Sequence, residues 1–101
     1  MTPDFQIDVA PGVEILVEFK TERGELAGYT VLLRVLRDGE WHEVRVWDNA
    51  HGDNEMHRYT RSGGKQAGVV FHQGSFAEGY RAAYADARTN FEEIVDGWER
   101  S

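Results

Sequence analysis

Residues 27–48 have the sequence AGYTVLLRVLRDGEWHEVRVWD, and this stretch decides the fold. Two runs rich in apolar and β-branched residues, 27–37 and 40–48, flank the dipeptide Asp38-Gly39. Asp-Gly favours a type I′ turn, because both central residues of that turn need positive φ. The stretch therefore predicts a β-hairpin.

A two-residue turn also sets the register of the hairpin. The predicted pairs are Arg37 with Glu40, Leu36 with Trp41, Val35 with His42, Arg34 with Glu43, Leu33 with Val44, Val31 with Val46, Thr30 with Trp47, and Tyr29 with Asp48. In this register one face is apolar, with Val31, Leu33, Val35, Val44 and Val46. The other face carries Trp41 and Trp47, and an exposed apolar patch of this kind often marks a partner or dimer surface.

The remaining segments complete an α+β fold. Alternating apolar residues predict a strand at 13–20, and further strands are expected at 55–61 and 69–72. Ser75 and Glu78 have the spacing of a capping box, and apolar residues at helical spacing then predict one helix over 76–98. We expect a single domain over 1–101: an antiparallel four- to five-stranded meander packed against one long C-terminal α-helix, with 1–12 as a loosely ordered N-terminal arm.

Composition narrows the classes of function. The chain has 101 residues, 18 acids against 11 bases, a formal net charge of −7 and no cysteine. Such a charge argues against nucleic-acid binding over the whole surface. Without cysteine, a metal would need histidine and carboxylate ligands. No apolar run approaches the roughly 20 residues that span a bilayer, so we expect a cytoplasmic protein with no membrane contact.

The stretch 47–59, WDNAHGDNEMHRY, concentrates the polar chemistry of the chain. In one interpretation His51 and His57 act as general acid and base beside Asp48. Arg58, Arg61 or Lys65 would then hold a phosphate, which suits metal-independent cleavage of RNA. In a second interpretation His51, His57 and Asp48 or Glu55 bind a divalent metal. In a third the loop is structural: Asp48 and Asn49 form side-chain turns, and Gly52 supplies positive φ.

The same stretch, with the helix that follows it, resembles a family of small uncharacterised bacterial proteins over roughly residues 29–98. In that family a strand ending in Asp-Asn precedes a His-Gly loop and an H-x-H-x-Y strand. The chain is also distantly similar to TumE-type toxins of toxin–antitoxin pairs. The resemblance implies that the signature positions are Asp48, Asn49, His51, Gly52, His57 and Tyr59. Glu55 departs from the pattern, because it stands where the family usually has the first histidine.

These observations predict catalytic roles for Asp48, His51, His57 and Tyr59. They predict substrate binding by Asn49, Arg58 and Lys65, with no metal and no cofactor. The expected partners are an RNA substrate, an antitoxin or other protein, and a second copy of the chain in a homodimer. The competing expectation is a non-enzymatic interaction or structural domain, and a His/carboxylate metal site is a third.

Overall fold

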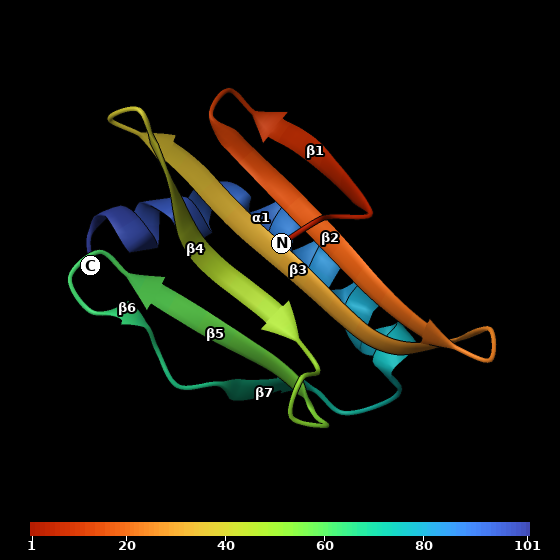
Figure 1. Ribbon diagram of the computed structural model, residues 1–101. Coiled ribbons are helices and arrows are strands. Elements are labelled where there is room, and N and C mark those ends of the chain that lie inside the picture. Colours follow the sequence, from red (N-terminus) through yellow and green to blue (C-terminus); the bar gives the residue numbers. More distant parts are fainter.

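The computed structural model describes all residues, 1–101. The elements in chain order are β1 (Phe5–Ala10), β2 (Val13–Glu22), β3 (Glu25–Arg37), β4 (Glu40–Asp48), β5 (Asn54–Thr60), β6 (Gly64–Lys65), β7 (Val69–His72) and α1 (Phe76–Glu99). Neighbouring strands pair antiparallel in the order β1-β2-β3-β4-β5-β6, and β7 pairs with β5. The helix α1 crosses behind β2 and β3 on one face of the sheet (Figure 1). The predicted α+β fold, with an antiparallel sheet and one C-terminal helix, is confirmed.

The N-terminal segment adds a strand that the sequence did not predict. Residues 5–10 form β1 and pair with β2, where a loosely ordered arm was expected. Ile7 and Val9 pack against the core, and the ring of Phe5 lies edge-on to that of Tyr84 of α1. Because Phe5, Ile7 and Val9 alternate with other residues along β1, their side chains lie on the same face of the sheet as the core. With β1 and the short β6, the sheet has seven strands.

The central hairpin follows the predicted register only near its turn. Asp38 and Gly39 have φ values of 53° and 78°, as a type I′ turn requires. The first four predicted pairs are present, from Arg37–Glu40 to Arg34–Glu43. A β-bulge then shifts the register, so that Leu33 lies opposite Arg45 and Val31 lies opposite Trp47.

The bulge places Trp47 and Val46 on the faces opposite to those predicted. Trp47, predicted on the outer face, is 1% exposed in the main core beside the helix. Val46, predicted on the core face, lies on the opposite face with Leu16 and Leu32. The prediction was wrong here because an inserted residue reverses the alternation of every residue beyond it. Below, the inner face is the one covered by α1, and the outer face is its opposite.

The helix begins and packs as the sequence predicts. The Ser75 side chain accepts from the backbone N–H of Glu78 at 3.1 Å, and its hydroxyl donates to the Glu78 carboxylate at 3.1 Å. Trp98 is buried in the core, whereas Phe91 is only partly buried at its margin. The single helix does not combine the length and apolar character that crossing a membrane requires.

Candidate functional site

Asn49 completes the hydrogen bonding of β3 beyond the end of β4. The strand β4 ends at Asp48, so residues 27–29 of β3 pair with β2 on one side and have no strand partner on the side of β4. The Asn49 side chain takes that place: its Oδ1 accepts from the N–H of Tyr29 at 3.0 Å, and its Nδ2 donates to the carbonyl of Ala27 at 3.1 Å. Both polar ends of this amide are thus used inside the fold, which explains why Asn49 is buried.

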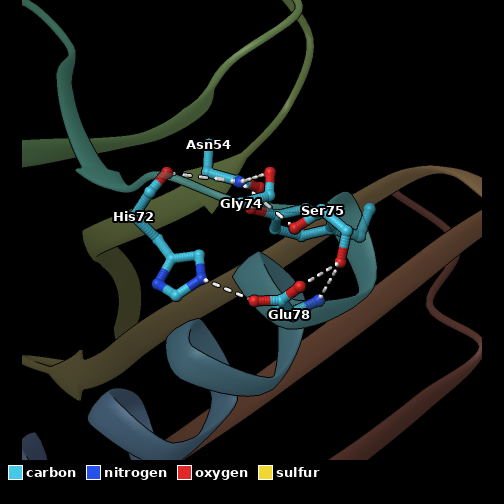
Figure 2. Close-up of polar contacts among 6 residues, drawn as sticks. Asn54, His72, Gly74, Ser75 and Glu78 are labelled. Carbon is cyan, nitrogen blue, oxygen red and sulfur yellow. Dashed lines mark hydrogen bonds and ion pairs between the residues drawn. The ribbon is translucent and has the colours of Figure 1, made fainter.

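Asn54 ties the sheet to the start of the helix (Figure 2). Its Nδ2 lies 3.3 Å from the carbonyl oxygens of His72, Gly74 and Ser75, and its Oδ1 accepts from the Tyr29 hydroxyl at 2.6 Å. Burial, and to a smaller extent the charge of Asp48, raises the pKa of Tyr29, so its hydroxyl keeps the proton that it donates. This 2%-exposed amide was not among the predicted site residues.

Gly79 leaves the space that Asn54 occupies. A Cβ on Gly79 would lie 1.9 Å from Asn54 Oδ1 and 2.2 Å from its Cγ. The helix therefore passes over Asn54 at a distance that only glycine permits, within one turn of its N-cap Ser75.

Asp48 begins the loop that follows β4. It lies opposite Thr30 on β3 and Glu55 on β5, whereas the predicted register placed it beside Tyr29. Its Oδ1 accepts from the N–H of Ala50 at 3.1 Å, which is the side-chain turn that the structural interpretation predicted. Gly52 has φ of 92°, as that interpretation also requires.

His57 lies on the outer face under a covering segment. Its Nδ1 is 3.0 Å from the carbonyl of Gln66, which can only accept, so Nδ1 carries the proton and a neutral ring leaves Nε2 free. A Cβ on Gly68 would lie 2.7 Å from His57 Cε1 and 2.8 Å from Glu55 Oε2. The chain at Gly68 thus packs directly against both side chains, and a substrate cannot approach them from that side.

The other two predicted catalytic residues lie in contrasting surroundings. His51 is exposed in the β4–β5 loop and forms no side-chain hydrogen bond or ion pair. Tyr59 is partly buried on β5. Burial raises the pKa of the Tyr59 hydroxyl, and the carboxylates of Glu43 and Asp48 raise it further. A phenol with a raised pKa stays protonated at neutral pH, which does not suit it to act as a base.

The predicted substrate-binding residues do not meet at one place. Arg58 lies opposite Arg45 and alternates with His57 and Tyr59, so it faces the other side of the sheet from them. Lys65 is exposed on β6, opposite Tyr59, at the far end of β5 from the buried Asn49. The structure also brings together no group of three or more His, Asp and Glu side chains able to hold a metal ion.

The outer face is the face of the sheet that α1 leaves uncovered, and the chain at Gly68 lies over its β5 side. Alternation along the paired strands places these acids on it: Asp8, Glu14, Glu18, Glu43, Asp48 and Glu55. Its strand bases are Lys20, Arg34 and Lys65, and Arg34 is neutralised by an ion pair with Glu14. The guanidinium of Arg34 lies 4.7 Å above the ring of Trp41, which is 42% exposed. The outer face is therefore acidic, with an apolar side chain at one end.

A shallow cavity of about 260 Å³ opens at the Asp48 end of this face. Glu18, Thr30 and Asp48 line it in one row across three strands, together with Lys20 and Asn49. Glu55 continues the row on β5, and its buried Oε1 has no hydrogen-bond partner. The row was readable in the sequence only as separate strand positions, because its members come from four strands.

Comparison with known proteins identifies a family. No curated protein and no solved structure matches the chain significantly. A family model described as a domain of unknown function, DUF7718, matches residues 1–101. Because that match spans the whole length, the chain belongs to the DUF7718 family.

Proposed function

We propose that this domain is a non-enzymatic protein-interaction module that binds a basic segment of a partner protein on its outer face. The carrying observation is the excess of acids over bases on a sheet face that no helix covers. Complementary charge steers such a partner to the face and fixes its register there. A second copy of this chain, with a net charge of −7, would be repelled from the same face.

The acidic row supplies the contact expected to be strongest. Glu18 and Asp48 line the cavity beside Lys20, so a lysine or arginine side chain entering it would meet two carboxylates and one ammonium group. Trp41 at the opposite end offers a ring for an apolar or cationic side chain of the same segment. Between them Leu16, Leu32 and Val46 form a small cluster of buried apolar side chains.

The residues of the polar loop support a non-enzymatic role, because most of their polar side chains form hydrogen bonds within the fold. The side chains of Asp48, Asn49 and Asn54 bond to groups of their own chain, as does the Nδ1 of His57. A ribonuclease would also have to attract phosphates to a face rich in carboxylates. Metal-independent RNA cleavage and the TumE-like relation stay predictions. If the chain cleaves RNA, the His51→Ala and His57→Ala variants should lose that activity.

A titration with an oligolysine peptide, followed by amide NMR shifts of the labelled domain, tests the proposal. We expect saturable shifts at Glu18, Thr30 and Asp48 that weaken as salt screens the charges. Oligoglutamate of the same length is the control and should cause none. Shifts confined to the acids of α1, or no saturable shifts at all, would overturn the proposal.

A further inference from the structure

Two arginines face each other on the inner side of the sheet, away from the proposed docking face. Arg45 on β4 lies directly opposite Arg58 on β5. The bulge in β4 turns Arg45 inward, because the shifted register pairs it with the core residue Leu33. Like charges at directly opposite positions destabilise a sheet. Burial and the charge of Arg58 lower the pKa of Arg45, and the charge of Asp86 on α1 partly offsets this.

Neither arginine has a hydrogen-bond or ion-pair partner in the fold. Neither forms a hydrogen bond through its side chain, and neither takes part in an ion pair. The Nε of Arg45 is buried without any acceptor. Buried donors without a partner are rare, and each one needs a physical explanation. Asp86, whose charge partly offsets the lowered pKa of Arg45, accepts instead from Asn90 at 2.6 Å.

The pair lines a cavity between the sheet and the end of the helix. Its volume is about 240 Å³, and its wall includes Arg45, Arg58, Thr60 and Trp98. The guanidinium of Arg45 is also held 5.9 Å from the ring of Trp47, which restricts its position. The cavity thus presents two guanidinium groups, a hydroxyl and an aromatic wall. Glu93 lines it too, without forming an ion pair there.

We propose that this crevice binds a small molecule through a compact oxyanion, a phosphoryl or carboxylate group held between Arg45 and Arg58. The planar guanidinium group can donate two parallel hydrogen bonds to two oxygens of a carboxylate or of a phosphoryl group. The bound anion gives the Arg45 Nε–H its missing acceptor and removes the repulsion between the two charges. The aromatic wall contacts the apolar part of the ligand.

The test uses the whole chain with inorganic phosphate and with acetate, in separate titrations at constant ionic strength. The Nε–H signals of the arginines are followed by NMR. Saturable movement of the Arg45 and Arg58 signals is expected with at least one anion, and the comparison shows which oxyanion the site prefers. Equal concentrations of chloride should leave both signals in place.

Matched variants separate a site from general attraction to charge. Arg58→Gln should weaken anion binding about tenfold or more, because it removes charge-assisted hydrogen bonds. Glu93→Gln should tighten binding, since it removes a carboxylate from the wall. Arg81→Gln removes the same charge from an exposed position on α1 and should change nothing. Absence of saturation with both anions, or equal effects of Arg58→Gln and Arg81→Gln, would overturn the proposal.

Discussion

Replacing Gly79 by alanine should destabilise the domain, although alanine is the better helix former. Considered within the helix alone, the change should stabilise by up to about 1 kcal/mol. The structure reverses the sign, because the added Cβ would lie 1.9 Å from Asn54 Oδ1. The amide cannot move aside freely, since it bonds to the Tyr29 hydroxyl and lies against the carbonyls before and at the helix N-cap.

The magnitude follows from two destabilising contributions and one stabilising contribution. Forcing an extra carbon into a packed site destabilises by ~1–3 kcal/mol. Displacing Asn54 leaves buried polar groups without partners, which costs about 1–3 kcal/mol more. Set against the helix-propensity gain of up to about 1 kcal/mol, the net loss of unfolding free energy should be about 1–5 kcal/mol. That is a large share of the stability of a chain of 101 residues.

Urea unfolding followed by tryptophan fluorescence measures this loss. Gly97→Ala is the matched control: Gly97 lies in the same helix, and nothing lies within 4 Å of its added Cβ. Gly97→Ala should therefore stabilise by up to about 1 kcal/mol. In an Asn54→Ala background, Gly79→Ala should lose most of its penalty. If both glycine variants stabilise the wild-type chain equally, the close approach of α1 to Asn54 is not real.

Three further outcomes test the fold. Trp47→Ala should lower the unfolding free energy by ~3–5 kcal/mol, whereas Trp41→Ala should lower it by less than about 1 kcal/mol, because the bulge buries only the first ring; equal losses would mean that the bulge is misplaced. Asn49→Ala should destabilise by about 1–3 kcal/mol by leaving two backbone groups of β3 unpaired, and an unchanged denaturation midpoint would contradict that role. Hydrogen bonding from Ser75, then from His72, lowers the pKa of Glu78, so its carboxylate contributes stability above the ordinary glutamate pKa that is lost as pH falls through the lowered value. Ser75→Ala should raise the Glu78 pKa in an NMR titration, and no change would refute the capping box.

Local sequence patterns predicted those parts of the fold that depend on residues close together in the sequence. The Asp38-Gly39 turn fixed the first pairs of the hairpin, and the capping box fixed the start of the helix. The bulge beyond Arg34 was not predictable from alternation, because Val44 and Val46 flank Arg45 as they would in a regular strand. The inserted residue in β4 turns Trp47 into the core, and alternation alone does not show where a residue is inserted.

The candidate site shows the same division. The turn made by Asp48 with Ala50 spans two residues and was predicted from sequence. Asn49 and Asn54 bond to groups 18 to 25 residues away, so no local pattern could assign their partners. Both residues lie in a segment whose composition suggested a catalytic site, and their side chains instead hold strands and the helix together.

The most direct test of the central claim compares two charge-matched double variants in oligolysine binding. One removes two acids from the outer face, Glu18→Gln with Glu43→Gln. The other removes two exposed acids from α1, Glu92→Gln with Asp96→Asn. Both change net charge equally, so only position differs. We expect at least about tenfold weaker binding for the outer-face variant and little change for the helix variant. Equal weakening in the two variants would show that the peptide follows net charge and that the outer face is not a docking site.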